Sequence, residues 1–156
     1  MTATKTAGSH LQYCTFHLGD LFLGVEVTRV QEVIRHQPST PVPLASPVIS
    51  GLMNLRGSIV TTIDLRRRLG LPDRAAGEEP MNVVIGADDG VVSLLVDEIG
   101  DVVDALDEAF EPSPPTLRSA TRDVIVGVYK LDGRLLLILD CDRVLDLPTT
   151  TLQETA

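Results

Sequence analysis

The sequence contains few aromatic residues and few of the groups that carry covalent or metal chemistry. Its 156 residues include three Phe, two Tyr, no Trp, three His and two Cys. A hydrophobic core must therefore be aliphatic, and the 44% of hydrophobic residues are enough to build one. Recognition of nucleic-acid bases by stacking is disfavoured, because stacking platforms are made of aromatic side chains.

Positive charge and long apolar runs are also scarce. The 13 Lys and Arg residues stand against 22 Asp and Glu residues, which gives a formal net charge of −9. Nucleic acids and anionic lipid surfaces would be repelled, so we expect neither as a partner. The longest aliphatic run, residues 135–139, is too short to cross a bilayer, and residues 1–10 lack the apolar part of a signal peptide. We therefore expect a cytoplasmic protein without membrane insertion.

The few reactive residues do not form a recognisable catalytic or metal-binding motif. Cys14 and Cys141 stand far apart and are expected to be small buried residues in a reducing compartment. No two histidines have a metal-ligand spacing, and the acidic residues between 97 and 111 lack the pattern of a calcium loop, which favours a solvated face. A metal-dependent hydrolase that uses Asp140 and Asp142 remains a minor alternative. We expect no catalytic residue, no metal and no cofactor.

The most informative positive feature is an internal repeat. Residues 51–69 align without a gap on residues 127–145. Four pairs of residues fix the register of this repeat: Gly51 with Gly127, Gly57 with Gly133, Asp64 with Asp140, and Leu69 with Leu145. A repeated glycine-framed hairpin indicates that one small β module was duplicated. The glycines are then backbone requirements of the hairpin, and the two aspartates at the strand ends are predicted helix caps.

Short segments with β-like patterns and turn signals occur in both halves. Residues 11–18 and 21–27 predict one hairpin and residues 83–96 a second, and residues 58–65 form the clearest strand of the first half. Residues 91–103 can be laid on residues 22–34. Within the latter, the apolar residues at 30, 33 and 34 are spaced as in a short helix.

This pattern predicts an all-β fold in which two small barrels pack together, because closure of a sheet removes its exposed edges. We expect one domain over residues 11–148, flanked by flexible tails at residues 1–10 and 149–156. Its two lobes would cover about residues 11–71 and 81–148, joined by the polar, proline-bounded residues 72–80. The sequence leaves open whether strands are exchanged between the lobes.

Arg56 is the residue best placed to contact a partner. It lies between Asn54 and Gly57 at a predicted tight turn, where its side chain can be held out into solvent. The simplest explanation is an intramolecular ion pair with Asp64 or Glu26. Against it, the repeat has an aspartate where Arg56 stands, so the module folds without an arginine at this turn.

Several ordered segments resemble the CheW family of chemotaxis coupling proteins. The carriers of this resemblance are Gln12-Tyr-Cys-Thr-Phe-His-Leu-Gly, Gly24-Val-Glu-Val-Thr-Arg-Val-Gln-Glu-Val-Ile, Gly51-Leu-Met-Asn-Leu-Arg-Gly, Ile59-Val and Ile63-Asp-Leu-Arg. Residues 94–102 and 127–145 are similar more loosely, so the resemblance extends over most of the chain.

The resemblance implies two interlocked, five-stranded SH3-like barrels with short helices, and an adaptor without catalytic activity. Members of the family bridge the cytoplasmic tips of chemoreceptors to the regulatory domain of the histidine kinase CheA, within receptor arrays at the membrane. Apolar barrel ends would contact the kinase. The receptor-facing groove, carried over by position, would contain Val30, Glu32, Gly51, Asn54, Arg56 and Val102, while Gly57, Gly127 and Gly133 would shape turns. A receptor pathway that controls surface motility or gene expression is the alternative.

Overall fold

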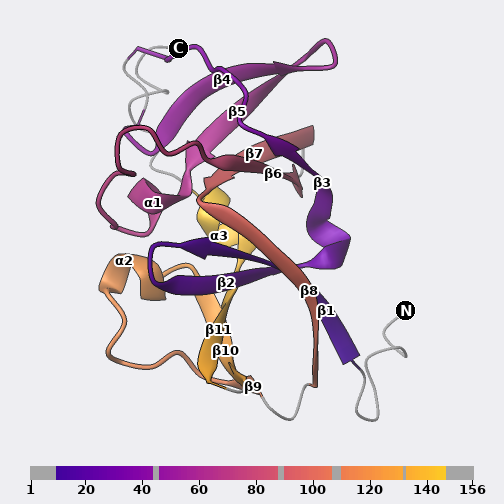
Figure 1. Cartoon of the computed structure of the whole chain (residues 1–156), viewed down its shortest axis with the longest axis vertical. Coiled ribbons are helices and arrows are strands. Elements are labelled where there is room, and N and C mark those ends of the chain that lie inside the picture. The colour runs from indigo at the N-terminus through magenta and orange to yellow at the C-terminus, as the bar shows by residue number, and fades with distance from the viewer. Residues whose placement is uncertain (1–9, 44–45, 88–89, 107–109, 132, 147–156) are drawn as a thin grey trace.

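The computed structural model describes residues 10–43, 46–87, 90–106, 110–131 and 133–146 (Figure 1). These residues form a six-stranded and a five-stranded sheet with short helices between them, which confirms the predicted all-β class. The expected tails, residues 1–10 and 149–156, lie outside the described residues, apart from His10 at the start of the first strand.

The six-stranded sheet occupies the lower half of Figure 1. Its strands, in spatial order, are β8 (Glu98–Leu106), β1 (His10–Leu18), β2 (Leu21–Glu26), β11 (Arg134–Leu139), β10 (Ile125–Leu131) and the short β9 (Phe110–Glu111).

The five-stranded sheet occupies the upper half. Its spatial order is β3 (Val30–Arg35), β6 (Met81–Ala87), β7 (Gly90–Val96), β5 (Ser58–Asp64) and β4 (Ile49–Leu55). The connections contain the 3-10 helix η2 (Val27–Arg29) and the helices α1 (Leu65–Arg68), α2 (Ser119–Arg122) and α3 (Cys141–Leu145).

Each sheet takes strands from both halves of the chain. Strand β3 of the first half pairs with β6 of the second, and in return β8 of the second half pairs with β1 of the first. The β4–β5 and β10–β11 hairpins also join strands of the opposite half, because β5 runs parallel to β7 and β11 runs parallel to β2. The sheets therefore do not divide the chain between residues 71 and 81. Their topology is a reciprocal exchange of strands, which the sequence left open.

The short helix expected at residues 30–34 is wrong. This segment is strand β3, in which half-buried and exposed residues alternate and Val30, Glu32 and Ile34 share the half-buried face. Spacing alone cannot distinguish a helix from a strand over so few residues. Pairing with β6 decides the outcome, because it satisfies the backbone of β3. Only the three residues before the strand form a helical turn.

The main core lies between the two sheets and is largely aliphatic, as the composition predicts. Fully buried side chains from the two sheets belong to one cluster: Phe16, Leu18, Leu23 and Val25 from the six-stranded sheet, and Ile85, Leu94 and Val96 from the five-stranded sheet. A second cluster is centred on Tyr13 and Tyr129 inside the six-stranded sheet. The shared core packs the two lobes together, since burial of apolar area is the main force that favours folding.

Candidate functional site

Arg56 occupies a two-residue turn between β4 and β5. The pairing of the two strands ends at Leu55 and Ser58, and both turn residues have positive φ, 53° at Arg56 and 88° at Gly57. Such a conformation matches the twist of a tight hairpin. The backbone N–H of Gly57 also donates to the side-chain oxygen of Asn54, at 3.0 Å. The turn therefore holds the Arg56 side chain outward, with 71% of it exposed.

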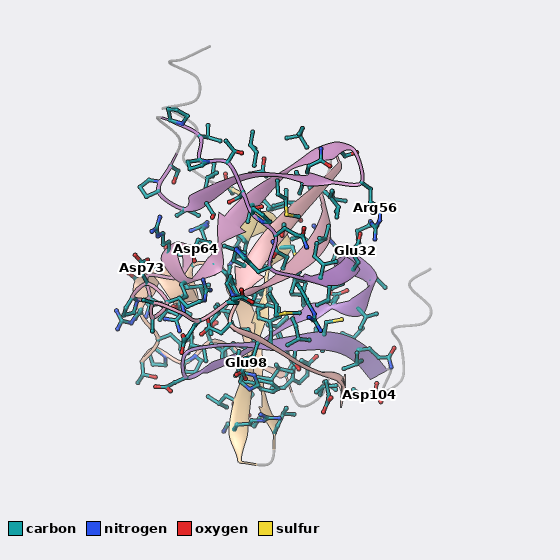
Figure 2. All side chains as sticks on the ribbon, turned by 45° about the horizontal axis from the view of Figure 1, so that its top comes forward. Glu32, Arg56, Asp64, Asp73, Glu98 and Asp104 are labelled. Atoms are coloured by element: carbon teal, nitrogen blue, oxygen red, sulfur yellow. The ribbon has the colours of Figure 1, made fainter. Side chains whose placement is uncertain are left out.

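The guanidinium of Arg56 pairs with Glu32 through two hydrogen bonds. Nη2 donates to Oε1 at 2.7 Å, and Nη1 donates to Oε2 (Figure 2). Glu32 lies on β3 and the turn follows β4, and these two strands are the opposite edges of the five-stranded sheet. The ion pair thus connects the two edges of a sheet that curls into a barrel. The hydrogen bond from Arg56 lowers the pKa of Glu32, although desolvation acts in the opposite direction.

Arg56 thus does form an intramolecular ion pair, the simpler explanation that the repeat had argued against, but its partner is Glu32 and not Asp64 or Glu26. Asp64 instead caps α1, where its side chain accepts a hydrogen bond from the backbone N–H of Arg66 at 3.1 Å. Glu26 lies at the end of β2 in the other sheet. The sequence does not point to Glu32 as the partner, because the spacing of residues 30–34 predicts a helix there. A strand with period-two alternation would have placed it on the inner face of an edge strand.

The remaining residues of the expected groove lie in different environments. Val30 is half-buried and packs against the main core, whereas Val102 is 56% exposed on β8. Cys14 of β1 pairs with Val25 on one side and with Val102 on the other. Val102 therefore lies two strands, about 10 Å, from Val25. It belongs to the six-stranded sheet, near the point where the chain leaves β2 for the other sheet.

Gly51 is buried and shapes the backbone. A Cβ at this position would lie 2.5 Å from the carbonyl oxygen of Thr40, a separation that side chains do not adopt. The Thr40 and Leu52 backbones are hydrogen-bonded to each other in both directions. The residue therefore allows the chain near Thr40 to lie against β4, and it has no side chain to offer a partner.

A charge cluster that the sequence did not reveal joins α1 to the end of β7. Arg66 donates to Asp97 through Nε at 2.9 Å and Nη2 at 2.5 Å, and Arg74 donates through Nε at 3.0 Å. The backbone N–H of Gly19 adds a fourth hydrogen bond at 2.8 Å. Desolvation raises the pKa of Asp97, but these donors outweigh it and lower the pKa to about 2.

We call these residues, Arg66, Arg74 and Asp97, the arginine clamp. Their side chains are only 11–17% exposed. The expected solvated acidic face is therefore wrong at Asp97, which serves as an internal anchor. Because the clamp ties α1 to the β1–β2 turn through Gly19, it links segments of both sheets.

The geometry offers no support for the hydrolase alternative. Asp140 caps α3 by accepting a hydrogen bond from the backbone N–H of Arg143 at 3.2 Å, which confirms the predicted capping role. Asp142 pairs with Arg29 at 3.3 Å. Within the described ranges, no group of three or more His, Cys, Asp or Glu residues is arranged to hold a metal ion.

The two cysteines differ in burial. Both are free thiols, and Cys141 is buried as expected, whereas Cys14 is half-exposed on β1.

Among the helices that the structure describes, none is both long and apolar enough to cross a membrane.

Comparison with known proteins gives a consistent result. The model of the CheW-like domain matches residues 12–148. The chain is 36% identical to the chemotaxis protein CheW of Bacillus subtilis (strain 168) over 146 residues, which is 94% of this chain and 92% of that protein. It is 32% identical to the chemotaxis protein CheW of Rhizobium meliloti (strain 1021) over 131 residues, 83% of each chain.

A solved structure has the same fold. The scaffolding protein TtCheW from Thermoanaerobacter tengcongensis superposes with a TM-score of 0.79 at 24% identity. The match covers 90% of this chain and 96% of that chain. The predicted architecture of two packed β lobes with short helices is thereby confirmed.

Proposed function

This chain belongs to the CheW-like family and is a noncatalytic coupling protein of chemotaxis, and on that premise we propose that it bridges two specific partners. One partner is the cytoplasmic tip of a chemoreceptor, and the other is the regulatory domain of the histidine kinase CheA. Recruitment from the cytoplasm to receptor arrays at the membrane is part of the same proposal. By binding both at once, the chain would pass conformational bias from receptor to kinase.

The observation that carries the receptor half of the proposal is the exposed Glu32–Arg56 pair. A receptor tip is a helical bundle, and one face of a helix binds well to a surface that combines apolar and charged side chains. Val30 supplies partly buried apolar surface on the same face of β3 as Glu32. The planar guanidinium of Arg56 can also donate hydrogen bonds to a carboxylate of a partner with defined geometry.

The pair is suited to recognition because it contributes little to folding. The pair lies at the surface, where an ion pair adds little to the stability of the folded state. Its charges can therefore be shared with a partner without loss of the barrel. Charges at such a site set the register and the choice of partner more than they add affinity.

The kinase would bind elsewhere, on apolar surface at the barrel ends. Ile59 and Leu135 occupy equivalent positions in the repeat and are 67% and 37% exposed. Exposed apolar side chains mark a contact surface when they form part of a larger apolar patch. The repeat thus presents one exposed aliphatic side chain at the same position of each hairpin, and we propose these two positions as parts of the kinase contact. When the receptor tip and the kinase domain each bind the same chain with moderate affinity, the effective concentration of one partner near the other would hold the assembly together without a single tight site.

The test is a titration of the purified chain with a receptor tip fragment and, separately, with the CheA regulatory domain of the same organism. We expect both to bind, and each to bind when the other is saturating. Arg56→Glu should weaken binding of the receptor tip by about tenfold or more, because it places two carboxylates together. Binding of the kinase domain should not change.

Lys130→Glu is the matched control. Lys130 is exposed in the second hairpin and pairs with Glu111 at 3.5 Å, so the variant reverses a surface charge at a different site. It should leave binding of the receptor tip unchanged. If Arg56→Glu folds and still binds the tip as the parent does, the assignment of the site fails. If neither partner binds the parent chain, the bridging function itself fails.

A further inference from the structure

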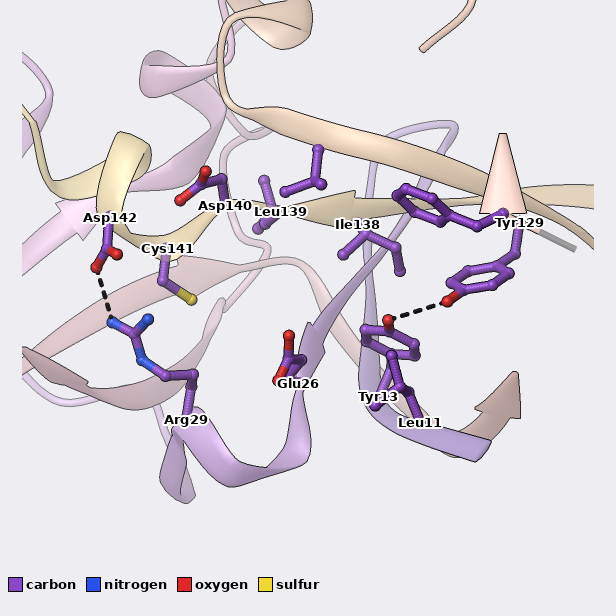
Figure 3. Close-up of a pocket in the computed structure, with 12 residues that line it drawn as sticks. Leu11, Tyr13, Glu26, Arg29, Tyr129, Ile138, Leu139, Asp140, Cys141 and Asp142 are labelled. Carbon is purple, nitrogen blue, oxygen red and sulfur yellow. Dashed lines mark hydrogen bonds and ion pairs between the residues drawn. The ribbon is translucent and has the colours of Figure 1, made fainter. Parts of the chain in front are cut away.

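The structure also contains a pocket that is separate from the Glu32–Arg56 pair. A pocket of about 480 Å³ lies in the six-stranded lobe, between the end of β2 with η2 on one side and strands β10 and β11 with α3 on the other (Figure 3). Its volume is in the range of pockets that hold ligands or protruding side chains, which is about 300–1,000 Å³. Neither Glu32 nor Arg56 lines it.

One end of the pocket is apolar. The buried rings of Tyr13 and Tyr129 lie 5.5 Å apart between centroids, and their hydroxyls are hydrogen-bonded to each other at 3.2 Å. Ile138 adds a buried aliphatic wall. Towards solvent, Phe110 and Val126 remain 37% and 49% exposed. An apolar side chain from outside would cover these two residues and remove their surface from water.

The other end is acidic. Glu26, Asp140 and Asp142 line it, and Arg29 is the one basic residue of the lining, although Asp140 also pairs with Arg143 outside the lining at 3.4 Å. Arg29 is already engaged, because it pairs with Asp142 at 3.3 Å. Glu26 is exposed, and its side chain makes no hydrogen bond or ion pair with any residue that the structure describes. The acidic end therefore has an open acceptor for a cation.

The pKa of the buried thiol of Cys141, which also lines the pocket, reflects the negative electrostatic potential of these carboxylates. Burial raises its pKa to about 11, and Asp142, Asp140 and Glu26 act in the same direction, while Arg29 opposes them. All three carboxylates thus disfavour negative charge at this position. A positive charge there is favoured for the same reason.

We propose that this pocket binds a surface segment of a partner protein in which an arginine or lysine stands beside an apolar side chain. The apolar side chain would cover Phe110 and Val126. The stem of the basic residue would pack along the tyrosine pair and its charged head would reach Glu26. Basic side chains commonly bury their methylene groups in this way while the charge finds a polar partner. Arginines that fill pockets are also frequent anchors of protein interfaces.

A capped tetrapeptide of serine, phenylalanine, arginine and serine is the first probe. Two matched peptides carry glutamate or norleucine in place of the arginine. Titration into the full chain, followed by two-dimensional NMR, should give saturable shifts at Tyr129 and Cys141. The arginine peptide should bind at least about tenfold more tightly than the glutamate peptide, with the norleucine peptide between them.

Two variants make the assignment specific. Glu26→Gln should weaken binding of the arginine peptide about two- to fivefold, because it removes the unpaired carboxylate without changing the shape of the side chain. Glu98→Gln, a change at an exposed glutamate of β8 outside the pocket, should have no effect. Equal affinities for the arginine and glutamate peptides, or unchanged binding in Glu26→Gln, would overturn the proposal. So would the absence of saturable shifts, or shifts that instead centre on Glu32 and Arg56.

Discussion

In the β4–β5 hairpin, Asp64 caps α1 directly after β5, and in the β10–β11 hairpin Asp140 caps α3 directly after β11. Both hairpins contain one register shift, at Gly51 in the first and at Gly127 in the second. Both then run parallel to a strand of the opposite half. The duplicated module therefore keeps its backbone plan in both lobes, and the plan depends on glycines and caps.

The charges on the two hairpins differ. Arg66 and Asp142 occupy equivalent places in the repeat, but Arg66 pairs with Asp97, whose side chain is only 17% exposed, whereas Asp142 is 81% exposed and pairs with Arg29. Only the first hairpin carries an arginine at its turn, and that residue reaches across the barrel to Glu32. The backbone plan is therefore common to both lobes, while the charges give each lobe its own ion pairs and its own surface.

Removal of Asp97, the largely shielded anchor of the arginine clamp, should have the largest effect. Asp97→Asn leaves Arg66 and Arg74 close together without a compensating charge, and we expect the free energy of unfolding to fall by about 3 kcal/mol. Asp142→Asn, at the exposed pair, should change it by less than about 0.5 kcal/mol. Urea unfolding of both variants measures the difference. Equal losses would contradict the distinction between the two lobes.

The arginine clamp also makes the stability of the folded chain depend on pH at low pH. The pKa of Asp97 is about 2 in the folded chain and 3.8 as its ordinary value. Since the folded value is the lower one, its contribution is fully present above about pH 4 and disappears as the pH falls towards 2. Between pH 5 and pH 2, Asp97→Asn should lose less stability than the parent chain does. Parallel pH profiles of the two proteins would reject the paired carboxylate as the cause.

The close approaches at the two glycines should have the next effect. In Gly51→Ala the new Cβ would lie 2.5 Å from the Thr40 oxygen, and in Gly127→Ala it would lie 2.6 Å from the Glu111 oxygen. We expect each variant to lose about 2 kcal/mol, because backbone atoms must move. Gly86→Ala is the control, since its nearest neighbour would be 3.6 Å away. A stable Gly127→Ala beside an unstable Gly51→Ala would break the equivalence of the two hairpins.

The helix caps should contribute less. Asp64→Ala and Asp140→Ala each remove the acceptor of one backbone N–H, which destabilises the chain by about 1 kcal/mol. Asparagine keeps an acceptor in the same place, so Asp64→Asn and Asp140→Asn should recover most of that loss. Thermal unfolding of the four variants provides the measurement. If asparagine recovers nothing, the ion pairs of Asp64 with Arg67 at 3.7 Å and of Asp140 with Arg143 at 3.4 Å matter more than the caps.

The sequence predicted the features that depend on local geometry. The repeat identified both caps, because a cap involves residues only two or three positions apart. Residues 30–34 were misread, since helix and strand spacing coincide over a short apolar segment and pairing with β6 decided between them. The Glu32–Arg56 pair and the arginine clamp join residues 23 or more positions apart. Such contacts require the exchange of strands between the halves, which periodicity does not encode.

The most direct test of the role of the Glu32–Arg56 pair is to exchange the charges of its two residues. The double variant Glu32→Arg with Arg56→Glu keeps an ion pair across the barrel but reverses the charges presented to a partner. We predict that its thermal unfolding transition stays close to that of the parent chain, because an ion pair at the surface contributes little to stability. Its binding to the receptor tip should fall by about tenfold or more, while binding to the CheA regulatory domain is retained. Parental affinity for the receptor tip in this double variant would contradict the account, because the pair would then serve the barrel and not the partner.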